Sequence, residues 1–251
     1  MKPKTAQKIL VSVRDDYDAI ADSFSDTRSR PWPEMEKFAS LVARGDRVLD
    51  IGCGNGRMYQ LLAEKAISYE GIDVSAGLIR HAQAQWGSVG TLAQSGSTFD
   101  ARANFRVGSW LALPYPDASF DVVVSIATLH HIPSGELRLT AMREAARVLK
   151  PGGFFMMTNW NRWKLAHLEN IAETWWRKLC GSGEDWNDLR IPWKRGPERV
   201  DRYYHAFTYR ELRRLCERAG FTVQEHYPEF RKFQHSRWFE RGESMVTICR
   251  K

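Results

Sequence analysis

Apolar residues in this chain form short continuous runs that alternate with stretches of helical spacing. The runs at 48–51 and 120–128 are rich in Val, Leu and Ile, which is typical of strands covered on both faces. Strands that alternate with helices indicate a parallel sheet with right-handed crossovers. The predicted strands are 48–51, 69–73, 104–107, 120–128 and 154–158, then a hairpin-like pair at 221–227 and 244–249; the predicted helices are 5–21, 34–43, 58–65, 75–84, 136–149 and 211–219.

The pattern predicts an α/β fold with a doubly wound, mostly parallel, seven-stranded sheet in a single domain, residues 1–251. We expect an N-terminal lid in 1–45, a ligand-binding core in 46–160, and a helical and aromatic insertion in 161–207. A C-terminal helix and strands would follow in 208–251. A stripe of apolar residues at helical spacing inside the insertion predicts packing against the core. Its members are Leu168, Ile171, Trp175 and Leu179.

The segment 48–56 organises the chain, because a predicted buried strand leads directly into glycines at positions 52, 54 and 56. Glycine is needed where the backbone takes an unusual conformation or where a ligand approaches closely. A strand, a glycine loop and a helix form the first part of a nucleotide-binding βαβ unit. Dinucleotide loops follow G-x-G-x-x-G and bind a pyrophosphate, whereas this loop is G-x-G-x-G followed by Arg57.

Asp50 and the three glycines match D-x-G-x-G-x-G, so the stretch resembles the loop of class I S-adenosylmethionine (SAM) methyltransferases. SAM carries a sulfonium and an ammonium but no phosphate, and an acid beside the loop suits such a cation. Asp73 ends the next strand 21 residues after Gly52, where an acid would bind both ribose hydroxyls; alternatively it caps the helix at 75–84. Ser109 stands where many class I enzymes have an aspartate that contacts adenine. The expected cofactor-binding residues are Tyr17, Asp50, Gly52, Cys53, Gly54, Asn55, Gly56, Asp73, Val74, Ser109, Trp110, Ile126 and Leu129.

The predicted helix at 5–21 is amphipathic. Together with the residues that follow it, this helix resembles a Tyr-x-x-Ala/Ile-x-x-Phe segment that lies over the cofactor in SAM methyltransferases, with Tyr17, Ile20 and Phe24 as the matching positions. A simple packing helix is the alternative. The segment 87–104 is rich in Gly, Ser and Thr and predicts a loop insertion.

Composition and charge favour a cytoplasmic protein with a polyanionic partner. Hydrophobic residues make up 43% of the chain, enough for a sizeable core, and no apolar run reaches the roughly 18 residues of a membrane span. The four cysteines lie far apart without a C-x-x-C pair, which favours neither a metal site nor disulfides. Residues 1–137 hold 14 Lys/Arg against 16 Asp/Glu (−2), and residues 138–251 hold 23 against 14 (+9). This asymmetry hints at nucleic acid, with a solubilising surface as the alternative.

Further segments carry a more specific resemblance. They are T-R-x-x-P-W-P at 27–33, A-x-x-H-H-I at 127–132, I-P-W-K at 191–194 and R-Y-Y-H-x-F at 202–207. With the glycine loop they resemble, over nearly the whole chain, the tRNA wobble-uridine methyltransferases that esterify 5-carboxymethyluridine. The chain departs from that family at Ser109, at the 87–104 insertion, and in a short segment before R-Y-Y-H where members often carry a basic insert. The resemblance implies the tRNA anticodon loop as partner and leaves open a need for the small zinc-binding activator subunit of eukaryotic members.

The resemblance also implies how the reaction is supported. Carboxylates of this kind have a pKa of about 4, so the acceptor is already a nucleophile at pH 7 and no acid–base dyad is expected. Alignment of the acceptor with the methyl group would then supply most of the catalysis, and it can lower the activation barrier by roughly 7–11 kcal/mol. Aromatic residues would stack on splayed bases and basic ones would bind phosphates; an ordinary cap over the sheet is the alternative. The expected catalytic residues are Arg28, His131, Tyr204 and His205, and the expected substrate- and RNA-binding residues are Trp32, Trp160, Trp193, Lys194, Arg195, Arg202 and Tyr203.

Two other functions stay open. The glycine loop and the H-H-I segment also occur in quinone- and sterol-type enzymes, which would make the protein a small-molecule methyltransferase. A non-catalytic RNA-binding subunit is the other alternative, and Ser109 is the residue that hints at it. We expect His130 to be packed rather than in contact with substrate.

Overall fold

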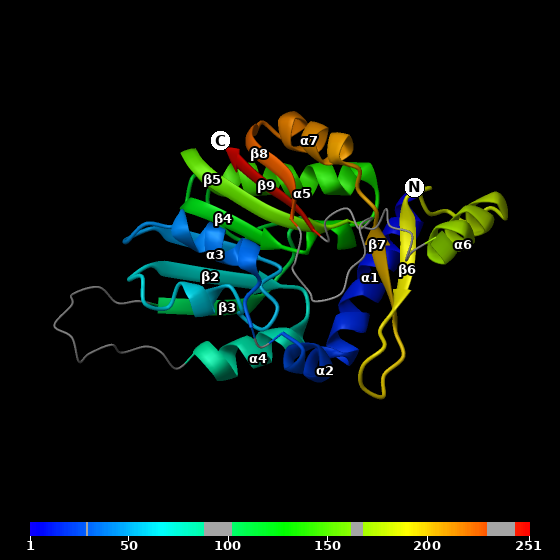
Figure 1. Cartoon of the computed structure of the whole chain (residues 1–251), viewed down its shortest axis with the longest axis horizontal. Coiled ribbons are helices and arrows are strands. Elements are labelled where there is room, and N and C mark those ends of the chain that lie inside the picture. The colour runs from blue at the N-terminus through cyan, green and yellow to red at the C-terminus, as the bar shows by residue number, and fades with distance from the viewer. Residues whose placement is uncertain (29, 88–101, 162–167, 230–243) are drawn as a thin grey trace.

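The computed structural model describes residues 1–28, 30–87, 102–161, 168–229 and 244–251 (Figure 1). Its centre is a seven-stranded sheet in the order β3-β2-β1-β4-β5-β9-β8. The first five strands in this order run parallel, and β9 pairs antiparallel with both β5 and β8. The strands are β1 (Arg47–Ile51), β2 (Ser68–Asp73), β3 (Arg102–Val107), β4 (Phe120–Ile126), β5 (Leu149–Trp160), β8 (Thr222–Glu229) and β9 (Ser244–Arg250).

Helices cover both faces of this sheet, because neighbouring residues of each central strand belong to different buried clusters. Leu49 and Val123 pack in the cluster that includes residues of α5 and α7, whereas Val48 and Val122 pack in the cluster that includes residues of α3 and α4. The predicted doubly wound, mostly parallel fold is therefore confirmed. The covering helices are α3 (Pro33–Ser40), α4 (Ala76–Trp86), α5 (Gly135–Val148) and α7 (Tyr209–Arg218).

The N-terminal helices and the insertion after β5 lie together beside one end of the sheet (Figure 1). The helices are α1 (Pro3–Ala19) and α2 (Ala21–Asp26). The insertion contains α6 (Leu168–Leu179) and an antiparallel pair, β6 (Asp188–Pro192) and β7 (Asp201–His205), which the sequence patterns did not predict. Ile9 and Val13 of α1 pack on Tyr203 of β7, so the two chain segments form one apolar contact.

The predicted helix at 211–219 is present as α7, and a capping box marks its start. The hydroxyl of Thr208 accepts a hydrogen bond from the Glu211 amide (3.2 Å), and the Glu211 carboxylate accepts one from the Thr208 amide (3.5 Å). Beyond the end of the helix, Gly220 has a φ of +92°, a conformation that side chains other than glycine disfavour. Both ends of α7 were therefore predictable from local residues.

The predicted helix at 58–65 is wrong. The structure has only a short 3₁₀ helix there, η1 (Tyr59–Leu61), and the following residues turn toward α3. The ammonium of Lys65 donates to the carbonyls of Ala39 (2.6 Å) and Val42 (2.9 Å), which satisfies backbone oxygens at the end of α3. These tertiary contacts outweigh the helix propensity of the segment.

Two members of the apolar stripe on α6 do not pack in the core as predicted. Trp175 is 48% exposed and Leu179 is 73% exposed, while the side chains of Leu168 and Ile171 lie outside the described residues, so the prediction for them stays open. Polar contacts hold this helix, among them the hydroxyl of Thr174, which donates to the carbonyl of Asp188 (2.6 Å), and the ion pair of Arg177 with Glu184 (2.9 Å).

The loop expected at 87–104 lies outside the described residues over 88–101. Its last part is strand, because β3 begins at Arg102 and pairs with β2.

Within the part of the chain that the structure describes, no helix combines the length and apolar character needed to cross a membrane.

Candidate functional site

A cavity lies at the carboxyl ends of β1, β2 and β4, where doubly wound sheets bind their ligands. Its walls come from the glycine loop, the segment after β4, α1 and β7. The predicted cofactor-binding residues that line it are Tyr17, Asp50, Gly52, Cys53, Gly54, Asn55, Asp73, Val74, Ser109, Trp110 and Ile126. The predicted catalytic, substrate- and RNA-binding residues that line it are Arg28, Trp32, His131, Trp160, Arg202 and Tyr204.

The glycine loop brings bare backbone to the cavity. Gly52 has a φ of +74°, and a Cβ atom there would lie 2.2 Å from Oγ1 of Thr128, so no side chain fits. Gly54 has a φ of +57°, and its amide donates a 3.0 Å hydrogen bond to Oδ2 of Asp73. The loop is therefore held to the end of β2 and leaves space above it.

Asp50 presents a buried carboxylate oxygen to the cavity. Its Oδ2 accepts a 2.5 Å hydrogen bond from the hydroxyl of Tyr69, whereas its Oδ1 has no hydrogen-bond partner among the residues that the structure describes. Burial raises the pKa of Asp50 to about 7. An uncompensated buried oxygen of this kind suits a cationic ligand group, and an ammonium fits both its charge and its acceptor capacity.

Asp73 lies beside it at the end of β2 and does not cap α4. The cap is Ser75, whose hydroxyl accepts from the Leu78 amide (3.1 Å), so the alternative role considered for Asp73 is wrong. Burial raises the pKa of Asp73, although its Oδ1 accepts a 2.9 Å bond from the Ser75 amide. Ser109 lines the same end of the cavity, and its hydroxyl accepts from the Leu111 amide (3.2 Å). Contacts of Asp73 with ribose and of Ser109 with adenine stay predictions.

Two predicted cofactor-binding residues do not line the cavity. A Cβ atom on Gly56 would lie 2.7 Å from Trp86 and 3.1 Å from Phe105, so this glycine is required for packing. Leu129 is fully buried in the apolar cluster beneath α5. The predicted contacts of both residues with the cofactor are corrected accordingly.

Tyr17 and His131 meet in the wall of the cavity. Nδ1 of His131 lies 2.8 Å from the carbonyl oxygen of Tyr203, which can only accept, so Nδ1 carries the hydrogen. In the neutral ring Nε2 is then an acceptor, and the hydroxyl of Tyr17 donates to it at 2.9 Å. This chain of hydrogen bonds joins α1, the segment after β4, and β7.

The side chains of Arg202 and Tyr204 enter the cavity from β7. The guanidinium of Arg202 lies 5.4 Å from the centre of the Tyr204 ring and 4.8 Å from that of Trp193. The Tyr204 ring stacks on His130 with ring centres 5.0 Å apart. Burial, and then the neighbouring Tyr204, raise the pKa of Tyr17, so its hydroxyl stays protonated.

The rim of the cavity combines arginines with indole rings. The guanidinium of Arg28 lies 4.9 Å from the centre of the Phe24 ring, and that of Arg57 lies 3.9 Å from the centre of the Trp32 ring. Trp32 also contacts Trp160 edge to face, with ring centres 6.0 Å apart. Aromatic faces and delocalised cations are thus gathered where the cavity opens.

Both acids and arginines line the cavity. Among the lining residues that the structure describes, the acids are Asp50 and Asp73, at the ends of β1 and β2. The lining arginines are Arg28, Arg57 and Arg202. Arg57 follows the glycine loop, and its charge acts against burial to lower the pKa of Asp50, whereas Arg202 comes from β7. The part formed by β1 and β2 therefore suits a cation, and the part bordered by Arg28 and Arg202 suits an anion.

Tyr203 and His205 face away from the cavity, which corrects both predictions. Side chains alternate along a strand, so the residues on either side of Tyr204 point to the opposite face of β7. The hydroxyl of Tyr203 donates to Oδ1 of Asp188 (2.7 Å), and His205 bonds to Asp188 and Glu211. Both side chains are almost fully buried, so Tyr203 is not available to stack on a base and His205 does not contact a ligand in the cavity.

The remaining predicted RNA-binding residues do not line the cavity. Trp193 is 9% exposed, and its indole nitrogen donates to the hydroxyl of Ser23 (3.0 Å), so it ties the insertion to α2. Its predicted stacking on a base is corrected for this reason. Lys194 and Arg195 are exposed in the segment that joins β6 to β7, where contact with RNA stays a prediction.

Other lining residues were missed or only partly foreseen. Arg57 follows the glycine loop directly, and this position was the signal that could have placed it at the cavity. Leu10 and Thr128 also line the cavity without a signal in the sequence. His130 is packed as expected, at 1% exposure, and its Nδ1 accepts from the Trp160 amide (3.4 Å), yet it also borders the cavity.

Comparisons with known proteins agree with this geometry. Residues 49–157 match the family model described as a methyltransferase domain. The chain is 32% identical over 234 residues to the tRNA (carboxymethyluridine(34)-5-O)-methyltransferase of Schizosaccharomyces pombe, covering 84% of this chain and 88% of the relative. Solved structures with the same fold include a SAM-dependent methyltransferase of Methanosarcina mazei (TM-score 0.67, 24% identity, 88% of this chain and 98% of that one). Another is a Haloferax volcanii methyltransferase in complex with the Trm112 methyltransferase activator (TM-score 0.63, 23% identity, 95% and 99%).

The cavity fits the cofactor of such enzymes, because SAM is a cation with an ammonium group. The buried Oδ1 of Asp50 and the bare backbone at Gly52 and Gly54 are the features that would hold it. The chain therefore belongs to the class I SAM-dependent methyltransferases, in the family that includes the tRNA carboxymethyluridine methyltransferases.

Proposed function

We propose that this protein esterifies the carboxylate of 5-carboxymethyluridine at the wobble position of tRNA. The division of charge in the cavity carries the proposal. The two acids lie where a cationic cofactor would bind, and Arg28 and Arg202 border the end that is left for the methyl acceptor. An anionic acceptor complements that end, and the Schizosaccharomyces pombe relative is named for this substrate.

The proposed reaction depends little on general acid–base catalysis. When bound, SAM supplies a sulfonium methyl: an acceptor oxygen forms the new C–O bond while the C–S bond breaks and its electron pair stays on sulfur. The acceptor carboxylate is ionised at pH 7, because its pKa is about 4. The protein therefore acts by alignment, and Arg28 and Arg202 orient the carboxylate through their charge. The protonated hydroxyl of Tyr17 adds a polar contact without taking a proton.

The rim supports recognition of a nucleotide outside a duplex. Proteins that read single-stranded RNA stack unpaired bases on aromatic rings and on arginine planes. Trp32 and Trp160 lie edge to face at the opening, and Arg57 stacks on Trp32. A uridine turned out of the anticodon loop would contact these rings when its carboxylate approaches the arginines.

A small activator subunit forms part of the same proposal. The Haloferax volcanii neighbour was solved in complex with the Trm112 methyltransferase activator. In this chain β3 is an edge strand of the seven-stranded sheet, and its residue Val107 is 54% exposed. Edge strands offer unpaired backbone groups and are common docking places for another chain.

The test is transfer of a tritiated methyl group from SAM to tRNA that carries carboxymethyluridine, with the same tRNA carrying uridine as the control. Each reaction is run with and without a Trm112-type activator, and the labelled tRNA is then treated with mild alkali. We expect counts only on the modified tRNA, and we expect alkali to release them, because methyl esters are labile to base.

Alkali-stable counts, or equal counts on both tRNAs, would contradict the proposed substrate. No counts with or without activator, from protein that binds SAM in calorimetry, would favour a small-molecule acceptor instead. Counts only in the presence of the activator would support both the substrate and the partner.

A further inference from the structure

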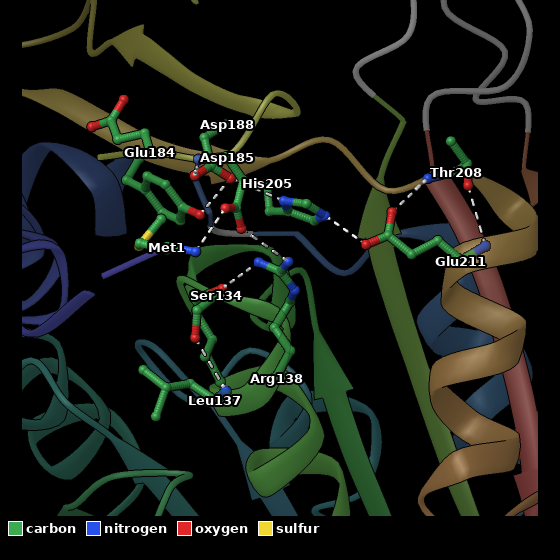
Figure 2. A network of polar contacts seen from close by, with 12 residues as sticks. Met1, Ser134, Leu137, Arg138, Glu184, Asp185, Asp188, His205, Thr208 and Glu211 are labelled. Atoms are coloured by element: carbon green, nitrogen blue, oxygen red, sulfur yellow. Dashed lines mark hydrogen bonds and ion pairs between the residues drawn. The ribbon is translucent and has the colours of Figure 1, made fainter. Parts of the chain in front are cut away.

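The reverse face of β7 carries a buried polar network outside the cavity (Figure 2). Asp188 of β6 is its centre, and its side chain is fully buried. Its Oδ1 accepts from the hydroxyl of Tyr203 (2.7 Å) and from Nδ1 of His205 (2.9 Å), and its Oδ2 accepts from the Asp185 amide (2.7 Å). One carboxylate thus binds two of the β7 side chains that point away from the cavity, Tyr203 and His205.

His205 also links this network to α7. Figure 2 shows its ring between Asp188 and Glu211, and its Nε2 lies 2.8 Å from Oε1 of Glu211. Both partners are carboxylate oxygens, so each ring nitrogen of His205 has an acceptor within hydrogen-bond distance. Although burial opposes it, the hydrogen bond from His205 keeps the pKa of Glu211 below its ordinary value. Arg138 of α5 approaches from below, with its Nη2 atom 3.9 Å from Asp185.

An ionic network is a costly way to hold a strand, because each buried charge must be removed from water. Apolar side chains would pack β7 with less desolvation, but they would fix its position less narrowly. A carboxylate that accepts hydrogen bonds from two side chains of one strand fixes the position of that strand relative to the carboxylate. It also fixes the rotation of the strand about its own axis. This geometry is useful where the other face of the strand has to be placed accurately.

The opposite face of β7 is the one that enters the cavity. The carbonyl of Tyr203 accepts the Nδ1 hydrogen of His131 (2.8 Å), which fixes the tautomer of that ring. The ring of Tyr204 lies 4.6 Å from His131 and 5.0 Å from His130, centre to centre. A shift of β7 would therefore move the carbonyl, the phenol ring and the guanidinium of Arg202 together.

We propose that Asp188 and His205 are positioning residues for methyl transfer, acting through β7 on Tyr204, Arg202 and His131. Neither residue is among the residues that line the cavity. The inference rests on the proposed function only in assigning the arginine-bordered end of the cavity to the methyl acceptor. The cofactor end is built from β1, β2 and the glycine loop, so loss of the network should affect acceptor use and spare SAM binding.

The test compares His205→Gln, Asp188→Asn and Tyr203→Phe with wild type. The glutamine variant removes the ring that bridges Asp188 and Glu211, and the asparagine variant removes the central carboxylate. The phenylalanine variant removes one of the two side-chain bonds to Asp188. A matched control is His226→Gln. His226 is bonded through both ring nitrogens, to Thr247 and to the Tyr209 carbonyl, but it lies on the edge strand β8.

We expect kcat/KM for modified tRNA to fall by about tenfold to a hundredfold in His205→Gln and Asp188→Asn, since small misplacements at a reacting centre cost this much. Tyr203→Phe should lie between these variants and wild type. The Kd for SAM should stay within about twofold of wild type in all three. His226→Gln should retain both values even if its melting temperature falls.

Wild-type kcat/KM in the folded His205→Gln and Tyr203→Phe variants would overturn the inference. So would an equal loss in the control, or a loss of SAM affinity that parallels the loss of turnover, because either pattern means general destabilisation. If Asp188→Asn does not fold, the other two variants decide.

A second readout separates this inference from the proposed substrate. The ¹⁵N NMR shifts of the His131 ring report its tautomer in protein to which no methyl acceptor has been added. We expect wild type to show hydrogen on Nδ1 and His205→Gln to show a mixture of forms. An unchanged spectrum would overturn the inference even if tRNA is methylated. A changed spectrum in protein that methylates no tRNA would retain the positioning role and refute the substrate alone.

Discussion

The hydroxyl of Tyr17 lies 2.9 Å from Nε2 of His131, although the two residues are 114 positions apart in the chain. The contact ties α1 to the segment after β4, directly over the cavity. The direction of this hydrogen bond is set by the other ring nitrogen. Nδ1 donates to the Tyr203 carbonyl, so Nε2 is the nitrogen that accepts from Tyr17. The hydrogen bond that joins α1 to this segment therefore takes its direction from a contact with β7.

Tyr17→Phe should weaken the contact between α1 and the segment after β4. Loss of one buried hydrogen bond lowers the free energy of unfolding by about 1 kcal/mol. We expect a several-fold fall in kcat/KM for the acceptor and little change in the Kd for SAM. Tyr115→Phe serves as the control, because that hydroxyl donates to Glu70 (3.2 Å) away from the cavity. Equal losses of activity in the two variants would refute a specific role for Tyr17.

Arg28→Gln should weaken use of the acceptor. The change removes one of the arginines that border the acceptor end but keeps a hydrogen-bonding side chain. We expect kcat/KM for modified tRNA to fall at least about tenfold, with SAM affinity unchanged, because the lost charge acts on an anion. Arg213→Gln on α7 is the control, since it removes the same charge from an exposed pair with Glu217. If both variants lose activity equally, overall charge rather than the site explains the effect.

Asp50 predicts a pH dependence whose sign can be worked out. Its pKa is raised to about 7 in the folded protein from an ordinary value of about 3.9. The folded state therefore binds the proton more tightly, and this residue's contribution to the free energy of unfolding falls as pH rises from about 4 to about 7. Binding of a cation has the opposite sign, because it requires the ionised carboxylate.

We therefore expect the affinity for SAM to rise between about pH 5.5 and pH 7, a range in which an α-amino group stays mostly protonated. Calorimetry on wild type and on Asp50→Asn measures this dependence. The asparagine variant should bind SAM more weakly and without the rise. A rise of equal size in both proteins would assign the titration to another group.

Gly52→Ala should abolish SAM binding. The φ of +74° alone costs an alanine about 1 kcal/mol, and the added Cβ would overlap the side chain of Thr128. Gly45→Ala is the matched control, because its φ is +86° and no atom lies within 4 Å of the added Cβ. We expect Gly45→Ala to lose stability by the conformational term only and to bind SAM normally. Similar unfolding free energies for the two variants would show that Thr128 yields to the new methyl group.

Features that depend on residues close together in the chain could be predicted from the sequence. The capping box of Thr208 and Glu211, the apolar strands and the glycine loop all form from a few consecutive positions. Asp50, Gly52 and Gly54 were placed at the cavity correctly for the same reason, since the segment 48–56 makes its own turn. Local patterns therefore determined the fold and the acidic end of the site.

The arginine-bordered end was decided by tertiary structure. The R-Y-Y-H segment implies that Tyr203 and Tyr204 point to opposite faces of a strand, but not which of them enters the cavity. That choice depends on where α1 and β6 pack against β7. Tyr203, which was predicted to bind RNA, instead donates its hydroxyl hydrogen bond to the buried Asp188. Tyr17, His131 and Arg202 likewise meet only because distant segments pack together. Contacts over such separations leave no trace in local periodicity, because they depend on which surfaces are buried against each other.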